Sequence, residues 1–430
     1  MSPNGKKLVV ISMDAMIGED LEYAKTLPTY GHMLEHGALV KDIREIYPTL
    51  TYPSHTTMIS GYYPDKHGVC SNFQQVPGCI DLPWNWYHHI VKTKDLMDAA
   101  KKAGMTTASV SWPVTGNHPS IDYLVDEIWA MGADATMDDL FSVFLASGTP
   151  QFLMESTVAQ HMELRIRRRQ PDTAWFSTYV AADIIREYAP DVITIHLANI
   201  DSFRHRFGVY SKEAKEAVRE SEEFLRTIVE AVRYTGFLPV TDFVITSDHG
   251  QIDIERQANV NVLLRENGFI DVDKDEKVTE CRAWSYTVDG SAHVALKDPK
   301  DWETYGRLEK VLRDACADGK HGISRVYTAE EVQKEEHLAG EMNFVLETDG
   351  KTEFTNEWRG GYFTEKHGGI HGHHPDKGPD PFFLGFGPSF KEGIVIEKAC
   401  LVDEAPTCAK VLGVDLPEDI DGSPILEMLR

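Results

Sequence analysis

Short runs rich in valine and isoleucine recur along this chain of 430 residues, and segments with helical spacing separate them. The runs are Leu8–Met13, Thr107–Ser111, Val192–Leu197, Phe243–Thr246 and Ile394–Ile396. Continuous apolar runs of this length are typical of strands buried on both faces, and their alternation with helices is typical of parallel sheets. The sequence therefore predicts an α/β fold with a mostly parallel central sheet and helices on both faces.

Two of the intervening segments have a clear helical pattern. Apolar residues recur at spacings of three and four across Ser211–Tyr234. A second such segment, Leu96–Ala103, ends before Gly104. We expect a helix at each of these places.

The pattern changes after residue 250. Short strand-like pieces and charged turns follow, with a helical stretch near Trp302–Ala317. We interpret residues 251–362 as an inserted cap subdomain, and residues 1–250 together with 363–430 as the core that contains the main sheet.

Acidic residues outnumber basic ones, with 68 Asp and Glu against 43 Lys and Arg, for a formal charge of −25. Nucleic-acid backbones and anionic membranes repel such a polyanion, so we expect neither as a partner. No apolar stretch approaches the ~18 residues of a membrane span, and no signal-peptide core precedes the first run. We expect a cytoplasmic protein with six reduced cysteines, a secreted mature form being the alternative. The oligomeric state is left open.

Three carboxylates follow three of the apolar runs. Asp14 comes directly after the first run, Asp201 follows Val192–Leu197, and Asp248 follows Phe243–Thr246. The carboxyl ends of parallel strands share one edge of a sheet, where ligands bind. We therefore expect these carboxylates to converge, although a single Asp at a strand end is more often a helix cap.

Imidazoles accompany these carboxylates. His205 lies four residues after Asp201, His249 follows Asp248 directly, and a late turn contains His371, His373 and His374. Oxygen and imidazole ligands without thiolate suit Zn²⁺, with Mn²⁺ as the weaker option. The pattern indicates a site for divalent cations.

A hydroxyl nucleophile is the expected feature of the segment Tyr47–Gly68. Pro53 and Ser54 are typical of a helix start, which would direct backbone N–H groups at an anion in the preceding turn. Thr51 is placed to attack such an anion, and a cation next to a hydroxyl favours its deprotonation. The alternative is that Thr51 is only a cap.

The ordered set of motifs resembles one known family. PTLTYPSHTTMISGYYPDKHGV, followed by Asn72, occurs with Asp14, DSFRH, SDHG and GIHG in that order. This set is similar to the nucleotide pyrophosphatase/phosphodiesterase branch of the alkaline phosphatase superfamily. The resemblance implies an alkaline phosphatase-like fold and a two-metal phosphoric ester hydrolase that acts through a phosphothreonine.

The resemblance also implies a role for each motif residue. Thr51 is the implied nucleophile and metal neighbour, and Asn72 the implied donor to the phosphoryl group. One metal would be held by Asp201, His205 and His371, and the other by Asp14, Asp248 and His249. His371 is preferred to His373 and His374 because it fits the family's Gly-x-His-Gly pattern.

Charge argues for a diester or pyrophosphate substrate. Monoesterases bind a dianion and usually add Lys or Arg around it. No Lys or Arg occurs between Lys102 and Arg165. Arg204, next to His205, could supply positive charge, although solvent exposure is the more common role of such a residue.

The leaving group is less defined. Aromatic residues occur among the acids of the same stretch, and a pocket of aromatic faces can stack a nucleobase or enclose a quaternary ammonium. Trp112 and Tyr123 are the candidate substrate-binding rings. A nucleotide or generic diester is the first expectation, and a choline-type phosphodiester the second. Phosphomonoesterase or phosphonoacetate hydrolase-like activity is a further alternative, and a non-enzymatic binding protein is the class that the intact motifs disfavour.

Overall fold

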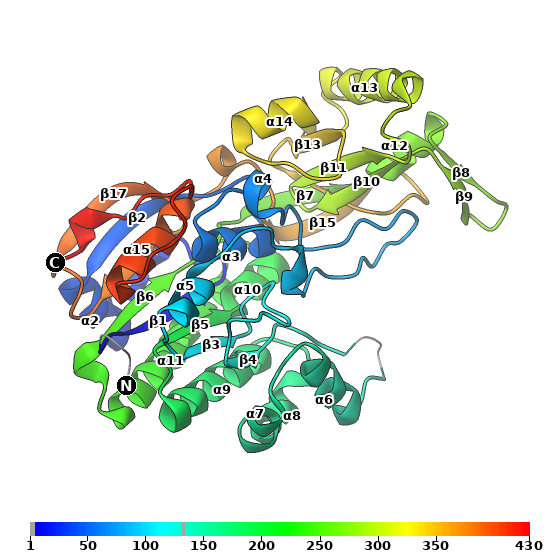
Figure 1. Ribbon diagram of the computed structural model, residues 1–430. Coiled ribbons are helices and arrows are strands. Elements are labelled where there is room, and N and C mark those ends of the chain that lie inside the picture. The colour runs from blue at the N-terminus through cyan, green and yellow to red at the C-terminus, as the bar shows by residue number, and fades with distance from the viewer. Residues whose placement is uncertain (1–4, 131–133) are drawn as a thin grey trace.

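An eight-stranded sheet forms the centre of the computed structural model, which describes residues 5–130 and 134–430 (Figure 1). The strand order is β17, β2, β16, β6, β1, β5, β3, β4, and the five strands from β6 to β4 run parallel, whereas β16 is antiparallel to both of its neighbours. The strands are β1 (Lys7–Met13), β2 (Ala38–Arg44), β3 (Thr107–Val110), β4 (Tyr123–Val125), β5 (Val192–Leu197), β6 (Thr241–Thr246), β16 (Phe383–Phe386) and β17 (Ile394–Cys400). Each run predicted as a strand is in this sheet.

Helices cover both faces of the sheet, and each face has its own apolar core. The first face is covered mainly by α2 (Pro28–His36), α6 (Met137–Ala146), α7 (Gln151–Ser156), α8 (Met162–Arg165), α9 (Asp172–Tyr188) and α11 (Lys212–Thr235). The second face is covered by α3 (Thr51–Ser60), α5 (Leu96–Lys102) and α15 (Glu404–Leu412). The short helices α1 (Leu21–Ala24), α4 (Pro64–His67) and α10 (Asn199–Phe207) lie in the connections. The α/β prediction with a doubly covered sheet is confirmed.

Both helices expected from spacing are present. The helix predicted at Ser211–Tyr234 is α11, and Ser211 is its N-cap. The helix predicted at Leu96–Ala103 is α5, and its N-cap Asp95 accepts hydrogen bonds from two backbone N–H groups of the first turn. These ends agree with the sequence because a cap residue at the start is a strong local signal.

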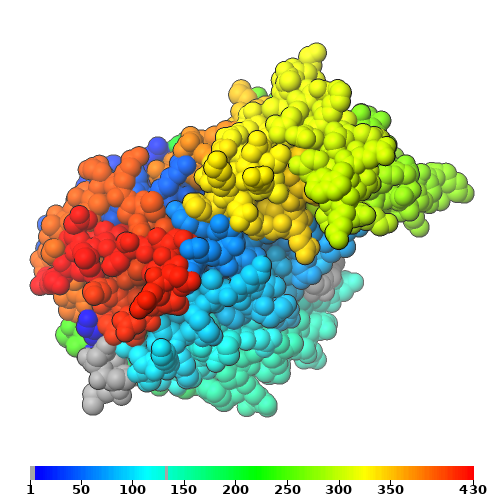
Figure 2. Space-filling model, turned by 45° about the horizontal axis from the view of Figure 1, so that its top comes forward, coloured from blue at the N-terminus to red at the C-terminus, as the bar shows by residue number. Residues whose placement is uncertain are grey.

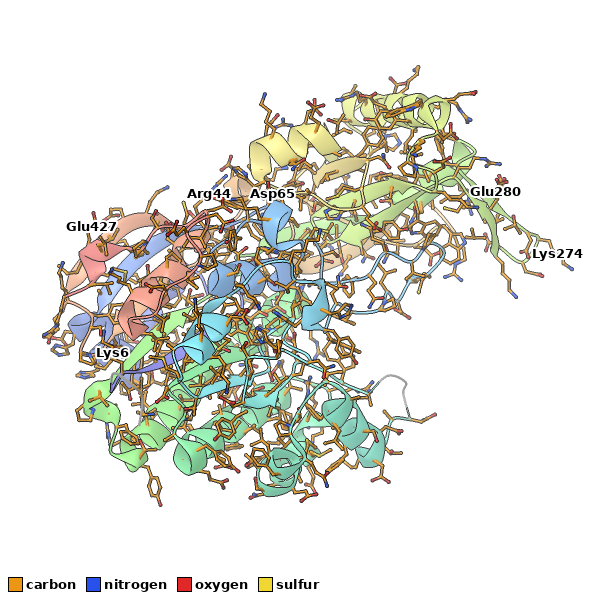
Figure 3. The ribbon with its side chains drawn as sticks, in the orientation of Figure 1. Lys6, Arg44, Asp65, Lys274, Glu280 and Glu427 are labelled. Atoms are coloured by element: carbon orange, nitrogen blue, oxygen red, sulfur yellow. The ribbon has the colours of Figure 1, made fainter. Side chains whose placement is uncertain are left out.

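The segment after β6 forms a lobe, drawn in yellow and yellow-green, that stands out from the rest of the molecule (Figure 2). It contains a four-stranded antiparallel sheet in the order β10, β11, β13, β12, and a hairpin of β8 and β9. Lys274 and Glu280 point outward from this hairpin (Figure 3). The elements are β8 (Ile270–Val272), β9 (Val278–Cys281), β10 (Ala283–Val288), β11 (Ser291–Leu296), β12 (Ile323–Thr328), β13 (Phe344–Thr348), α12 (Val260–Glu266), α13 (Trp302–Ala317) and α14 (Ala329–Glu336).

A three-stranded sheet connects this lobe to the core. Its central strand β7 (Ile252–Ala258) pairs with β14 (Thr352–Phe354) and with β15 (Phe363–Ile370). Because His371 follows β15 directly, the late His-rich turn is carried by a strand that pairs with the first strand of the lobe. Over the described residues, no helix is long and apolar enough to cross a membrane.

Replacing Ser211 with Ala is expected to lower the free energy of unfolding by about 0.5–2 kcal/mol. The Ser211 hydroxyl accepts the Ala214 N–H at 3.1 Å, and Ala leaves that N–H without its cap. Urea denaturation would measure the loss. Ser211→Asp, which keeps a capping oxygen, is the control, and equal midpoints for the Ala variant and the wild type would contradict the assignment.

Candidate active site

Three adjacent parallel strands end at the same edge of the sheet and bring the predicted carboxylates together. Asp14 follows β1, Asp248 and His249 follow β6, and Asp201 lies in the first turn of α10 after β5. Since β1 lies between β6 and β5, these positions are neighbours although they are far apart in sequence. The expected convergence at the carboxyl edge is therefore present.

One group of possible metal ligands consists of Asp201, His205 and His371, whose ligand atoms lie within 4.8 Å of one another. His205 Nε2 is 3.1 Å from Asp201 Oδ1, and His371 Nε2 is 3.8 Å from the same oxygen. These are the three residues expected to hold one ion.

A second group surrounds His249 Nε2. Thr51 Oγ1 is 3.1 Å from this nitrogen, Asp248 Oδ2 is 3.2 Å away, and Asp14 Oδ1 is 3.5 Å away. Ligand atoms on a tetrahedral ion with bonds of about 2.0–2.2 Å are about 3.3–3.6 Å apart. The Asp14 distance falls in this range, and the other two are slightly shorter. Asp14, Asp201 and His249 also offer ligand atoms within 4.8 Å of one another, so a candidate cation site lies next to His249.

The ring tautomers also suit this arrangement. His205 Nδ1 donates to the Gly369 carbonyl at 2.8 Å, and His249 Nδ1 donates to the Gly250 carbonyl at 3.2 Å. A proton on Nδ1 leaves the Nε2 lone pair of each neutral ring directed at the carboxylates. Both rings are thereby oriented as ligands.

Burial shifts the pKa values of the carboxylates around His249. Burial, and then repulsion from Asp201, raises the pKa of Asp14 well above its usual range. Burial, and then repulsion from Asp14, does the same to the pKa of Asp248. One oxygen of each, Asp14 Oδ1 and Asp248 Oδ2, is buried without a hydrogen-bond partner in the described structure. Two such oxygens facing one another call for positive charge between them.

Ion pairing shifts the pKa values in the other group. Burial acts against a charged His205, but Asp201 raises the pKa of His205 to about 10. Burial likewise acts against a charged Asp201, but His205 lowers the pKa of Asp201. Burial, and then the charge of His205, lowers the pKa of His371 to about 3. A cation bound here would take the place of the proton that Asp201 favours on His205, which leaves the neutral ring described above.

Thr51 is the first residue of α3, two positions earlier than the helix start expected from Pro53 and Ser54. Asn72 Oδ1 accepts the backbone N–H of Tyr52 at 2.8 Å. This bond orients the Asn72 amide, whose N–H₂ group is then the part that can donate to an anion next to Thr51. The structure brings Thr51, Asn72 and His249 to one place.

His373 and His374 lie away from these groups. His373 Nδ1 donates to the His374 carbonyl at 3.0 Å, and the His374 ring contacts Glu336 and Tyr47. Of the three imidazoles in this turn, His371 is the one that joins the carboxylates.

The three candidate substrate-binding residues are not brought to the ligand groups. Trp112 is fully buried, and its indole N–H donates to the His55 carbonyl at 3.2 Å. Tyr123 lies at the opposite, N-terminal end of β4 and stacks on Tyr188. Arg204 is buried, not solvent-exposed, and its guanidinium donates to both carboxylate oxygens of Asp20 at 2.8 Å.

Other aromatic rings gather next to Thr51 instead. Tyr52, the residue after Thr51, lies 5.4 Å from Trp84 between ring centroids, and Trp129 contacts Trp84 and Trp86 edge-on at 4.9 and 5.2 Å. Nothing in the sequence indicated that these three tryptophans would lie together.

An ion cluster borders these rings. The Arg165 guanidinium is buried 5.8 Å from the Trp129 ring centroid and interacts with Glu127 and Asp126. Glu127 Oε1 lies 3.7 Å from His196 Nδ1. Arg165 lies just beyond the stretch without Lys or Arg, so the sequence argument from that stretch missed this cation.

Two further histidines lie behind the carboxylates. His196 Nε2 is 2.9 Å from Asp14 Oδ2. His55 Nδ1 donates to the Thr51 carbonyl at 2.8 Å and lies 3.4 Å from Asp248 Oδ2 without a hydrogen bond to it. Both rings are buried and contact each other. The sequence offered one sign that His196 is functional, because it is the one histidine inside the predicted buried strand Val192–Leu197.

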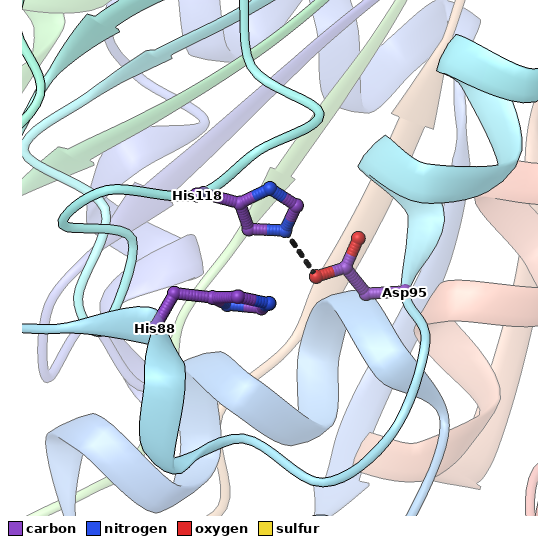
Figure 4. A group of neighbouring side chains, drawn as sticks. All are labelled: His88, Asp95 and His118. Atoms are coloured by element: carbon purple, nitrogen blue, oxygen red, sulfur yellow. Dashed lines mark hydrogen bonds and ion pairs between the residues drawn. The ribbon is translucent and has the colours of Figure 1, made fainter.

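His88, Asp95 and His118 form another group with ligand-type atoms within 4.8 Å (Figure 4). His118 Nδ1 accepts the Ser120 N–H at 3.1 Å, so its proton is on Nε2, which faces Asp95 Oδ2 at 2.9 Å. A neutral ring that binds a cation through Nε2 needs its proton on Nδ1. This group is therefore a satisfied structural contact between His118 and the N-cap of α5, with the His88 ring packed against His118.

Comparisons with known proteins agree with this geometry. The family model for type I phosphodiesterase / nucleotide pyrophosphatase matches residues 8–375. Ectonucleotide pyrophosphatase/phosphodiesterase family member 7 of Mus musculus is 22% identical over 443 residues, covering 99% of this chain and 87% of that protein. The Homo sapiens member 7 is 23% identical over 449 residues, covering 99% and 84%.

Among solved structures, murine ectonucleotide pyrophosphatase / phosphodiesterase 5, as an inactive threonine-to-alanine variant in complex with AMP, superposes with a TM-score of 0.69. The sequences are 16% identical, and the match covers 99% of this chain and 100% of that one. The fold is therefore shared. The names of the relatives describe ectoenzymes, so the comparisons do not support the cytoplasmic location expected from the sequence.

Asp248→Asn is expected to stabilise the metal-free protein at neutral pH by about 1–3 kcal/mol, because it removes a buried charge that faces Asp14. A raised pKa means that folded Asp248 binds a proton more readily than unfolded Asp248, so its unfavourable contribution grows as the pH rises through that pKa. The advantage of the variant should therefore shrink as the pH falls.

Urea denaturation in excess chelator between about pH 5 and 8 would measure this difference. Glu365→Gln is the control, because the Glu365 side chain is 86% exposed. A variant no more stable than the wild type at any pH would contradict the electrostatic interpretation.

Proposed function

Because the chain belongs to the type I phosphodiesterase / nucleotide pyrophosphatase family, we propose that it is a two-metal phosphoric ester hydrolase that cleaves phosphodiester or nucleotide pyrophosphate bonds. Thr51 is the proposed nucleophile. The observation that carries the proposal is the position of the Thr51 hydroxyl, 3.1 Å from His249 Nε2 at the first residue of α3. A hydroxyl held among cation ligands is suited to attack on phosphorus.

The donors fit divalent cations. They are carboxylate oxygens and imidazole nitrogens, and the two buried carboxylate oxygens without hydrogen-bond partners would be satisfied by an ion. We assign one ion to Asp201, His205 and His371, and the other to Asp14, Asp248 and His249 next to Thr51. Zn²⁺ suits this set best, with Mn²⁺ as the alternative. Bound ions would favour deprotonation of Thr51 and stabilise charge on the leaving oxygen.

The reaction has two displacements. Thr51 Oγ forms a bond to phosphorus while the bond to the leaving alkoxide breaks, which gives a phosphothreonine. Water then attacks the same phosphorus, releases the phosphoryl group and regenerates the hydroxyl. The Asn72 N–H₂ group stabilises the non-bridging oxygens in both steps. In the first turn of α3 only the Thr51 N–H can assist, since Tyr52 donates to Asn72 and Pro53 has no N–H.

The surroundings of Thr51 favour a leaving group with a flat or a cationic face. Trp84, Trp86 and Trp129 are partly exposed and provide rings for a nucleobase, whereas the Tyr52 ring is buried against Trp84. AMP, which the murine relative binds as an inactive variant, supports a nucleotide as the first candidate. The carboxylate of Glu127 next to these rings favours a choline-type leaving group as the second.

Thr51→Ala is expected to lower kcat by about 10³-fold or more while leaving bound metal and folding intact, because it removes only the attacking oxygen. Steady-state kinetics with bis(p-nitrophenyl) phosphate and metal analysis would measure both properties. Thr56→Ala is the matched control, since the Thr56 hydroxyl donates to the Tyr52 carbonyl in the same helix. Full activity of the Thr51 variant would exclude Thr51 as nucleophile.

The substrate class can be tested with four p-nitrophenyl or nucleotide substrates. We expect kcat/KM to be highest for a dinucleotide or bis(p-nitrophenyl) phosphate, and lowest for p-nitrophenyl phosphate. A maximum for p-nitrophenylphosphorylcholine would select the choline-type alternative. A preference for the monoester would contradict the diester assignment and would point to Arg165 as the cation that holds a dianion.

A further inference from the structure

We propose that Asp289 is a positioning residue for His371: its carboxylate accepts the Nδ1 proton of His371 while Nε2 of the same ring faces the cation. Asp289 lies in the segment 251–362, outside all of the sequence motifs. The inference rests on the metal centre proposed above.

The first observation concerns the hydrogen-bond partners of the Nδ1 atoms of the three histidines. His205 and His249 each donate Nδ1–H to a backbone carbonyl. His371 Nδ1 is buried and has no hydrogen-bond partner in the described structure. Asp289 Oδ2 lies 3.6 Å from it, on the side of the ring away from Asp201. A small rotation of the Asp289 side chain closes this gap to a hydrogen bond.

The second observation is that the two backbones are locked together. Asp289 is in the turn between β10 and β11, with a φ of 61°, and the next residue, Gly290, donates its N–H to the His371 carbonyl at 2.9 Å. A Cβ on Gly372 would lie 1.8 Å from the Val288 carbonyl oxygen. The turn that contains His371 is therefore pressed against this hairpin, and a side chain at residue 372 would separate them.

The third observation concerns competing partners of Asp289. Lys366 attracts Asp289, but its ammonium pairs with Glu353 Oε2 at 2.6 Å. His205 attracts it as well, but both nitrogens of His205 have partners, Asp201 and the Gly369 carbonyl. Among these neighbours in the described part of the chain, His371 Nδ1 is the ring nitrogen near Asp289 that has no other partner.

A carboxylate on the far nitrogen of a ligand imidazole fixes the tautomer and makes the ring more basic. Loss of such a partner typically weakens metal binding by about 10–100-fold. The inserted segment would thus contribute to the site that Asp201, His205 and His371 form, and leave the site of Asp14, Asp248 and His249 unchanged.

Calorimetric titration of the chelator-stripped full chain with Zn²⁺ tests this inference. The wild type should show two binding events, and Asp289→Ala should weaken one of them by about 10–100-fold. Asp289→Asn, which keeps an acceptor oxygen without the charge, should fall between the two. Glu365→Gln, which removes an exposed carboxylate from β15, is the matched control and should bind like the wild type.

Chelator-stripped Asp289→Asn should melt with the wild type, because Asn tolerates the φ of 61° at this position, whereas Asp289→Ala should melt somewhat lower. Within each variant, the comparison between the two metal sites is informative. Two unchanged affinities in such a variant would overturn the role of Asp289, as would equal weakening of both sites. A wild type that binds no metal and hydrolyses no ester would instead refute the proposed function. The two failures are therefore distinguishable.

Discussion

Repulsion between buried carboxylates is the constraint on which this structure depends. The sheet order places Asp14, Asp201 and Asp248 at one edge, and burial there raises the cost of charge on Asp14 and Asp248. Imidazoles lie against these carboxylates from several elements: His205 and His249 face them with Nε2, and His196 contacts Asp14 from behind. The formal charge of −25 does not bar an anionic substrate, because the charge that matters is the local one at this edge.

Residues 251–362 contact the candidate site directly, through the turn that contains His371, and do not only cover it. Strand β7 pairs with β15, which ends just before His371, and the β10–β11 turn donates the Gly290 N–H to the His371 carbonyl. This contact gives a physical reason for Gly372 in the Gly-x-His-Gly motif. The residue has a φ of 75° and lies too close to the Val288 carbonyl for any side chain. Gly372 of the motif is therefore required by the packing of the lobe, next to the metal ligation that the resemblance implies for His371.

Substrate recognition was the part of the site least accessible from sequence. Trp112 and Tyr123 are aromatic residues among the acids of one stretch, but one is in the core and the other lies at the N-terminal end of β4. Arg165 directly follows the stretch without Lys or Arg in the sequence, and in the structure it interacts with acidic residues of that stretch. Single rings and charges have no local signature that separates packing from binding, because each depends on contacts between distant segments.

The sequence by itself determined five of the eight strands of the main sheet, the two capped helices α5 and α11, and the residue types at the strand ends. These follow from local rules, namely the length of apolar runs, helical spacing and cap chemistry. Only the tertiary structure decided that Thr51 opens α3 beside His249 and that Asp289 faces His371. The preference for His371 over His373 came from the motif, and the structure places His371 next to Asp201. Strand order and the packing of the lobe against the core set these contacts. The residues involved are far apart in sequence, and sequence separation does not predict which of them lie close together.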